Sequence, residues 1–285
     1  MQPRVTRAGD VAGRTARPVR RPGRFPANSV YWSWYVPRNF GDWITPYLFE
    51  RLSGRAPRHR RPEQLEPGER VLFGAGSILR HLRRPGVAVV WGSGIIAGTD
   101  RFAAPLRTHA VRGPLTRARM RALGYPCPAV YGDPGLLLPR VHRPAPGPRF
   151  RLGLIPHFAD LPAIAARPLP EGWTLIDVTR PVEAVADAIA ACERTVSSSL
   201  HGIIVSQAYG VPCAWIAAQA KLHGDGTKFL DHYAALGRPA PRAASWDEVT
   251  PATLKPLEFV AADVTDLQDR LLSACPFLAA WEPAA

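Results

Sequence analysis

The strongest constraint on the fold comes from one stretch of the chain, RTVSSSLHGIIVSQAYGVPCAWI, which runs from Arg194 to Ile216. Two short apolar runs in it predict buried strands, and the segment between them predicts a helix over 202–209. The polar turn SSSLHG directs hydroxyls and backbone N–H groups toward the start of that helix, where anions bind readily. This order is typical of a parallel α/β sheet with a ligand site at the carboxyl ends of its strands.

The same pattern of an apolar run followed by a glycine-rich turn recurs in the first half of the chain. After a proline-rich segment, the alternation of strands and helices restarts at residue 151. Strands are predicted at 30–34, 70–73, 87–91, 108–111, 129–131, 151–155, 173–177, 195–196 and 213–216. Helices are predicted at 43–52, from 114 to a stop at Gly124, and at 182–192, 202–209, 227–236 and 264–272. Residues 54–68 are predicted to be a surface loop.

These elements divide into two α/β units joined by a linker. We predict a disordered basic arm over 1–27, an N-terminal α/β domain over 28–140, a Pro-rich linker over 141–150 and a C-terminal α/β domain over 151–285 that holds the donor site. The last helix is expected to pack back across the junction. Two such units bring their strand ends to a shared interdomain cleft, where ligands bind in many proteins.

Composition narrows the classes of partner. The formal net charge is +13, and arginine supplies most of the basic residues, which favours a solvated surface, then an anionic small substrate or an anionic membrane face. Nucleic acid is not expected, because no basic stripe interleaved with aromatics is found. No apolar run reaches the roughly 18 residues of a membrane span, and no secretory signal pattern is found, so cytoplasm is expected. The four cysteines fit no metal-binding spacing and are expected to be free core residues.

Five segments together resemble a known family. They are NFGDWITPYLFERLSG from Asn39, WGSGI from Trp91, AVRGPLTRARMRALGYPCPAVYGDPGLLLP from Ala110, GLIPHF from Gly153, and SSSLHGIIVSQAYGVPCAWI from Ser197. With them the chain resembles the polysaccharide pyruvyl transferases, in particular the succinoglycan-type ketal pyruvate transferase branch. Many members carry an arginine two places before the histidine of the last segment, where this chain has Ser199.

The resemblance implies a fold and a reaction. The fold would be two Rossmann-like domains in a GT-B-like arrangement. The reaction would move a pyruvyl group from phosphoenolpyruvate onto a sugar diol as a ketal. The acceptor would be an exopolysaccharide or cell-wall glycan or its lipid-linked precursor, and a lipid-linked acceptor would place the protein at the inner face of the membrane. Phosphoenolpyruvate is the donor substrate, and neither a cofactor nor a metal is expected.

His201 is the candidate general acid and base, because ketal formation needs proton transfer near neutral pH. The alternative is a helix-start histidine that bonds a neighbouring carbonyl. The candidate donor-binding groups at the same turn are Ser197, Ser198, Ser199 and Gly202. The serines have an alternative role as ordinary helix N-caps, and the two roles are compatible.

Cations elsewhere in the chain are candidates for the roughly three negative charges of the donor. Arg112 follows a predicted strand, and its guanidinium suits a carboxylate or phosphate. Its alternative role is a salt bridge, either on the surface or between the domains. Lys228 belongs to a loop-to-helix segment, with Lys221 and His223, that is expected to fold over the donor. The alternative for this segment is a solvated loop.

Acceptor-binding candidates follow the first strands of the two units. Asn39 and Asp42 lie in a tight loop, and His157 follows the strand at 151–155. Asp42 is a partner or base for a sugar hydroxyl, or else the N-cap of a helix that begins at Trp43. His157 has a structural alternative. The GxG turns at 74–76 and 92–94 lack the third glycine of a dinucleotide site.

Two other functions stay open. One is a GT-B-type glycosyltransferase that uses a nucleotide sugar, although no acidic ribose-binding residue is placed. The other is a catalytically silent glycan- or anion-binding protein. This alternative stays open because the chain has Ser199 where many family members have an arginine. Phosphoenolpyruvate, but not nucleotide sugars, would raise the melting temperature of a pyruvyl transferase.

Overall fold

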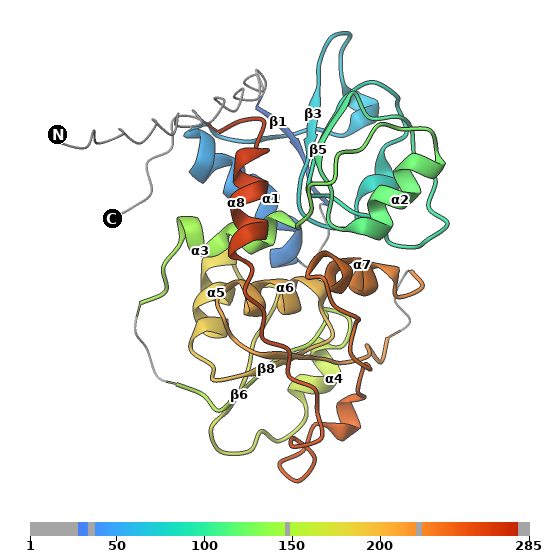
Figure 1. The fold of residues 1–285 in the computed structure, drawn as a ribbon. Coiled ribbons are helices and arrows are strands. Elements are labelled where there is room, and N and C mark those ends of the chain that lie inside the picture. The colour runs from blue at the N-terminus through green and yellow to red at the C-terminus, as the bar shows by residue number, and fades with distance from the viewer. Residues whose placement is uncertain (1–27, 34–37, 146–148, 221–223, 279–285) are drawn as a thin grey trace, which may run out of the picture.

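Two parallel β-sheets organise the chain, and helices pack on and between them (Figure 1). The computed structural model describes residues 28–33, 38–145, 149–220 and 224–278. Within these residues the first sheet has the strand order β2-β1-β3-β4-β5 and the second has the order β7-β6-β8-β9. The fold is therefore mixed α/β, as predicted. Its division into two domains in a GT-B-like arrangement stays a prediction.

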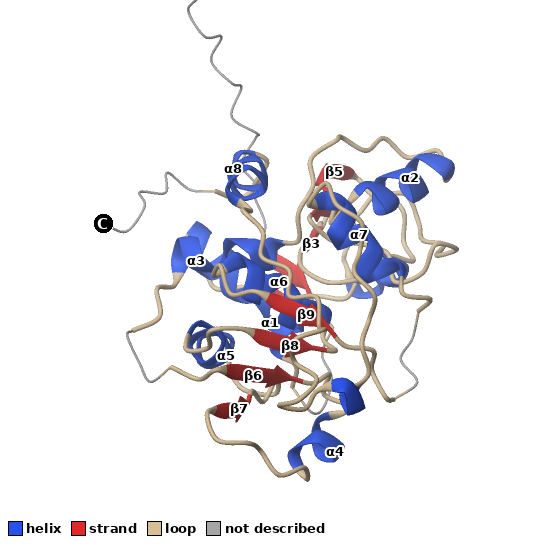
Figure 2. Ribbon diagram, turned by 60° about the horizontal axis from the view of Figure 1, so that its bottom comes forward, coloured by secondary structure: helices blue, strands red, loops and turns tan. Residues whose placement is uncertain are grey.

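Every strand pair within the two sheets is parallel. The strands of the first sheet are β1 (Ser29–Tyr31), β2 (Arg58–His59), β3 (Val71–Phe73), β4 (Ala88–Trp91) and β5 (Arg107–Ala110). Those of the second are β6 (Leu152–Ile155), β7 (Trp173–Leu175), β8 (Thr195–Ser197) and β9 (Cys213–Trp215), which lie side by side in Figure 2. In each sheet the first strand lies between the second and the third. The strand order therefore reverses between β1 and β3, and between β6 and β8, where ligands of open α/β sheets bind.

The helices follow local signals in the sequence. They are α1 (Phe40–Ser53), α2 (Pro114–Ala122), α3 (Leu138–Val141), α4 (Leu161–Ala165), α5 (Val182–Ala190), α6 (Leu200–Ala208), α7 (Thr227–Ala235) and α8 (Thr265–Ser273). Short 3-10 turns are η1 (Pro62–Gln64), η2 (Leu79–His81), η3 (Pro134–Leu137) and η4 (Trp246–Glu248). Pro114 opens α2 at the position where its missing N–H costs nothing. Gly124, with a φ of 82°, follows its end in the left-handed conformation.

Three sequence predictions are wrong in detail. Helix α1 begins at Phe40 rather than at Trp43, because the side chain of Asn39 accepts the N–H of Gly41 (3.1 Å) and caps the helix. The predicted surface loop at 54–68 contains β2, which pairs with β1, and the turn η1. The strand predicted at 129–131 is reduced to a single bridge between Tyr131 and Val111.

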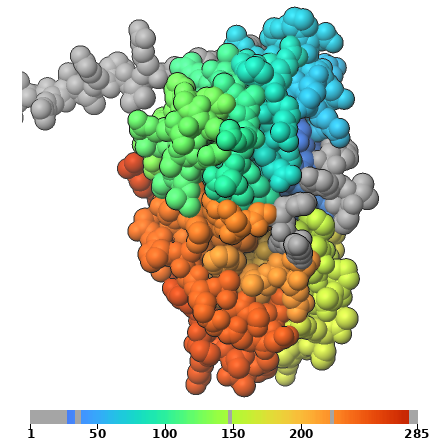
Figure 3. Space-filling model, turned by 90° about the vertical axis from the view of Figure 1, so that its right-hand side faces the viewer, coloured from blue at the N-terminus to red at the C-terminus, as the bar shows by residue number. Residues whose placement is uncertain are grey.

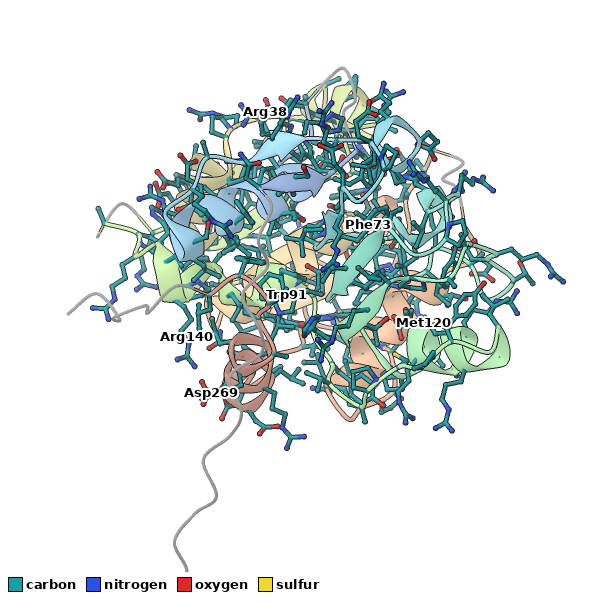
Figure 4. All side chains as sticks on the ribbon, turned by 90° about the horizontal axis from the view of Figure 1, so that it is seen from above. Arg38, Phe73, Trp91, Met120, Arg140 and Asp269 are labelled. Carbon is teal, nitrogen blue, oxygen red and sulfur yellow. The ribbon has the colours of Figure 1, made fainter. Side chains whose placement is uncertain are left out.

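One hydrophobic cluster extends across both sheets. It joins Val30 and Ile44 of the first unit to Ile155 and Val185 of the second. Helix α8 crosses back to this cluster, as the sequence predicted: the Nε1–H of Trp91 donates to the Leu271 carbonyl (2.9 Å). In Figure 4 Trp91 lies beside α8. The two sheets thus share a core, which fixes how their strand ends face each other.

The remaining predictions on organisation have mixed outcomes. The arm at 1–27 lies outside the described residues, as does 146–148 of the proposed linker, and the domain boundaries stay predictions. The cysteines are free, and three are buried, whereas Cys127 is only half-buried. In the part of the chain that the structure describes, no helix has the length and apolar character needed to span a membrane.

Candidate active site

A cavity of about 450 Å³ lies where the strand order of both sheets reverses. Its walls come from the segments that follow β1, β3, β6 and β8, together with the start of α7. The residues that face it include Asn39, Asp42, His157, Ser199, His201 and Lys228. Six of the ten residues that the sequence singled out therefore meet in one place, and Arg112, Ser197, Ser198 and Gly202 do not line it.

His201 stands in the first turn of α6 with its side chain 11% exposed. The ring packs against Gly41, where an added Cβ would stand 2.6 Å from the His201 Cγ atom. Its Nε2 atom is buried and lies 3.6 Å from Oδ2 of Asp133, longer than a hydrogen bond. Among the described residues, the bond to a neighbouring carbonyl that the sequence left as the alternative is not formed. His201 lines the cavity, and its Nδ1 is the ring atom that an added Cβ on Gly41 would overlap most closely.

Asp133 faces the His201 ring from the turn that starts η3. Its carboxylate is wholly buried and accepts the N–H groups of Gly76 (3.0 Å) and Gly135 (2.9 Å). Burial by itself raises the pKa of Asp133, but the nearby His201 and these amides hold that pKa below its usual range. Asp133 is therefore an anion that lies beside the His201 ring.

Asp42 lies in the first turn of α1, two residues after the start of the helix. It is not the N-cap, since Asn39 has that role. The carboxylate is half-buried at the cavity wall. Burial raises the pKa of Asp42 to about 6, while attraction to His201 and Lys228 lowers it. Asp42 is thus a carboxyl group that exchanges protons close to neutral pH.

Lys228 reaches the cavity from the first turn of α7. Burial and repulsion by Arg112 lower the pKa of Lys228 to about 8, and Asp42 acts in the opposite direction. The ammonium group lies 5.1 Å from the centre of the Phe229 ring. A cation with this much burial is held ready for an anionic ligand.

Arg112 lies behind the cavity wall. Its side chain is 0% exposed and pairs with Asp231 of α7 at 3.0 Å. It also donates to the Ser77 hydroxyl (2.6 Å) and to the Ile95 carbonyl (2.6 Å). The guanidinium is thus engaged by protein groups, and Ser77 lies between it and the cavity. This geometry matches the salt bridge that the sequence left as the alternative.

The three serines of the turn differ in position. The Ser197 hydroxyl accepts the Ser199 N–H (3.0 Å), and that of Ser198 donates to Asp160 (3.0 Å), so both hold the turn from inside. Gly202 is needed for packing, since a Cβ there would stand 2.8 Å from Ile155. Ser199 alone of these lines the cavity, and although it is the N-cap residue of α6, its side chain makes no capping bond.

His157 follows β6 and also lines the cavity. Its backbone N–H donates to the Ser198 hydroxyl (2.8 Å), which fixes the turn, and its Nδ1 accepts the N–H of Ala159 (3.2 Å). Burial and the charge of Lys228 lower the pKa of His157 to about 4. The ring is therefore neutral at pH 7, and its Nε2–H is a donor for an oxygen of a ligand.

The cavity carries an excess of positive charge. Among its described lining residues, Lys228 and Arg80 are cations, and Asp42 is the one carboxylate. The first-turn N–H groups of α6 add a positive helix end, since such amides lack acceptors within their own helix. No group of three His, Cys, Asp or Glu side chains in the described ranges is arranged to hold a metal ion. The arrangement combines an anion-binding wall with proton-transfer groups.

A site of this kind, at the strand ends of two parallel sheets, is typical of an α/β enzyme. The profile of the polysaccharide pyruvyl transferase family matches residues 58–219, more than half of the chain. The protein belongs to this family. The matched range includes Arg112, Asp133, His157 and His201, whereas Asp42 and Lys228 lie outside it.

One curated relative is an uncharacterized protein of Acanthamoeba polyphaga mimivirus. It is 31% identical to this chain over 160 residues, which are 52% of this chain and 55% of the relative. The chain thus spans about half the length of the curated relative it matches. No solved structure matches the chain.

Proposed function

We propose that this protein transfers a pyruvyl group from phosphoenolpyruvate to two hydroxyls of a sugar, which forms a ketal on an exopolysaccharide, a cell-wall glycan or a precursor of one. The observation that carries the proposal is the pairing of His201 with the buried Asp133 beside a cationic cavity, in a member of the polysaccharide pyruvyl transferase family. A histidine beside a buried carboxylate is suited to act as the acid that protonates a carbon.

The donor is expected to bind between α6 and α7. Lys228 and the Ser199 hydroxyl face the cavity there, beside the first-turn amides of α6. These groups suit the phosphate and carboxylate of phosphoenolpyruvate. Many family members have an arginine at the position of Ser199, and in this chain Lys228 supplies a cation in its place. Arg112 was predicted to contact the donor directly. We now expect it to support this wall of the cavity through its contacts with Ser77 and Asp231.

The acceptor is expected to enter from the side of α1 and β6. Asn39, Asp42 and His157 face the cavity from these segments. The donor Nε2–H of His157 and the carboxylate of Asp42 are suited to bind adjacent hydroxyls. A lipid-linked acceptor would bring the protein to an anionic membrane face, which its net charge of +13 would attract.

The chemistry begins at His201. The protonated imidazole delivers its proton to the methylene carbon of the donor, and the neighbouring carbon becomes electrophilic. A sugar hydroxyl attacks that carbon, phosphate leaves, and a second hydroxyl closes the ketal. Buried Asp133 stabilises the imidazolium before the transfer and orients the ring.

The direct test measures phosphate release from phosphoenolpyruvate with a panel of galactosides, glucosides and mannosides, and detects the ketal on the acceptor by mass spectrometry. We expect phosphate and ketal in equal amounts, and none with His201→Ala. His109→Ala, a half-buried histidine on β5, is the matched control and should keep activity. Donor-induced stabilisation without turnover on any acceptor would instead indicate a silent binding protein.

A further inference from the structure

Ketal formation requires several proton transfers: one to the methylene carbon and one from each of the two sugar hydroxyls. One imidazole nitrogen carries only one proton at a time. In the reaction, the bond between carbon and the phosphate oxygen and the π bond to the methylene carbon break, two bonds from the first carbon to sugar oxygens form, and one C–H bond forms at the methylene carbon. The two hydroxyl protons supply the balance, because one ends on the methylene carbon and the other on the released phosphate. No oxidant or reductant takes part.

His201 is restricted to one of these transfers at a time. Its Nε2 is buried against Asp133, and its ring is fixed between α6 and the first turn of α1, where Gly41 leaves room for it. When the imidazole gives its proton to the methylene carbon, the ring becomes able to accept one. The first hydroxyl attacks while that transfer is under way, so a different base is needed for its proton.

Asp42 has the geometry for this second role. It lies next to Gly41, against which the His201 ring packs, so both groups face the same end of the cavity. The other buried carboxylates nearby are occupied: Asp133 accepts two backbone amides, and Asp231 bonds Arg112 and the start of α2. No described side chain or backbone group donates a hydrogen bond to the Asp42 carboxylate.

We propose that Asp42 is the second proton-transfer group of the reaction, taking the proton of the attacking hydroxyl and passing it to the departing phosphate. This inference rests on the proposed pyruvyl transfer. The second hydroxyl then returns a proton to His201, so both groups end in the state in which they began. Asp42 thereby becomes a catalytic residue and not only a binding group for the acceptor.

The surroundings of Asp42 agree with this role. Burial raises its pKa to about 6, against the lowering by His201 on α6 and Lys228 on α7. The other charged or titratable groups on the cavity wall are Arg80 and His81 of η2 and His157 after β6. A base with a pKa near the working pH transfers protons efficiently in both directions. Because the base must be ionised, turnover should fall as the pH drops through about 6.

The test compares Asp42→Asn and Asp42→Glu with the wild type and with Asp266→Asn, an exposed acid in the first turn of α8. We expect Asp42→Asn to lower kcat by about 100-fold or more. Phosphoenolpyruvate should still raise the melting temperature of Asp42→Asn. This result would show that the variant binds the donor and has lost a step of catalysis. The acidic limb of the pH profile should disappear in Asp42→Asn and return in part in Asp42→Glu. Asp266→Asn should match the wild type.

A partial reaction adds a second readout. In deuterium oxide, NMR follows the loss of the vinylic hydrogens of phosphoenolpyruvate, which requires protonation of the methylene carbon. Asp42→Asn should keep this exchange, and His201→Gln should lose it. The inference is overturned if Asp42→Asn keeps kcat within twofold of the wild type, keeps the acidic limb, or loses exchange together with turnover. A wild-type protein that forms no ketal with any acceptor would instead count against the proposed function.

Discussion

Gly41 leaves the space in which the His201 ring stands. It occupies the second position of α1, and a Cβ there would come within 2.6 Å of Cγ and 3.0 Å of Cβ in His201. A glycine inside a helix costs about 0.5–1 kcal/mol relative to alanine. The first turn of α1 therefore gives up some helix stability so that an imidazole from α6 can pack closely against it.

The Gly41→Ala variant tests this packing. The added methyl group forces the ring out of its position, and a misplacement of about 1 Å reduces catalysis by about 100-fold. We expect kcat to fall by that order while the melting temperature is unchanged or higher. Gly98→Ala is the control, because its Cβ would meet nothing closer than 3.7 Å. A fully active Gly41→Ala variant would contradict the placement of the ring.

Asp42 has a predicted effect on stability that is separate from its effect on turnover. Its pKa is about 6 in the folded protein, against 3.8 for an ordinary aspartate. The folded state thus binds the proton more tightly than the unfolded state, so the free energy of unfolding falls as the pH rises from about 4 to 6. The ionised carboxylate of Asp42 destabilises the protein above this range.

Asp42→Asn should remove that loss of stability. Urea unfolding at pH 7.5 should give a variant more stable than the wild type, by on the order of 2 kcal/mol. Near pH 4 the two proteins should be equally stable, because the wild-type carboxyl is then protonated in the folded state. An equal difference at both pH values would show that Asp42 does not titrate in this window.

At the scale of elements, α7 is fixed to the first unit by a buried charge. Asp231 of α7 accepts the N–H groups of Leu115 (2.8 Å) and Thr116 (3.0 Å) at the start of α2, as well as pairing with Arg112. The green and orange segments that contain α2 and α7 meet on the face in Figure 3. Because Lys228 lies one turn before Asp231, this contact positions the cation at the cavity.

Asp231→Ala should therefore weaken both the fold and donor binding. Removing one partner of a buried ion pair destabilises a protein by about 3–5 kcal/mol, since the remaining charge is left uncompensated. We expect a loss of this size in urea unfolding and a larger rise in KM for the donor than for the acceptor. Arg112→Ala should act in the same way, and the double variant should lose less than the sum of the two.

The control for this pair is Asp247→Ala, which breaks a surface bridge to Arg167 (3.1 Å) at a residue that is 80% exposed. Such a bridge contributes about 1 kcal/mol at most. Additive losses in the double variant, or an unchanged KM for the donor in both single variants, would rule out a joint role of Arg112 and Asp231 in placing Lys228.

The elements show which features a sequence can predict. Periodic apolar runs and local stop signals predicted most strands and helices, and α2 between Pro114 and Gly124 is a clear case. Short β2 was missed because two residues carry no periodicity, and its pairing with β1 is a contact distant in sequence. The start of α1 was misplaced because Asn39 and Asp42 are both good caps, and only the backbone decides between them.

The site was predictable only in part, for a similar reason. The polar turn before α6 and the loops after other strands identified residues that do line the cavity, including His201, Asp42 and Lys228. The contact between Asp133 and His201 links residues far apart in the chain, so no local signal distinguished it from an ordinary turn. For Arg112, a strand-end position does not tell a ligand contact from a buried ion pair.

At the scale of the whole molecule, the cavity depends on a core that both sheets share. The cluster that contains Val30 and Ile155 also contains Leu271 and Phe277 from the end of the described chain. The Phe277 ring packs on Phe49 of α1 with 4.9 Å between ring centres. Helix α8 and the residues after it follow the second unit in the chain but pack on the first unit. This packing holds the strand ends of the two sheets in place relative to each other.

A shared core predicts that both sheets unfold together, and Leu271→Ala tests this. Leu271 is 0% exposed, so its truncation should cost about 2–5 kcal/mol. Hydrogen exchange across a denaturant series should show the amides of β3 and β4 losing protection at the same lowered midpoint as those of β6 and β8. Leu267→Ala, half-buried on the same helix, should have a smaller effect. If β6 and β8 instead keep the wild-type midpoint, the sheets are independent cooperative units, and the placement of the His201 ring beside Gly41 and Asp42 must be held by the contacts of α1, α6 and α7 alone.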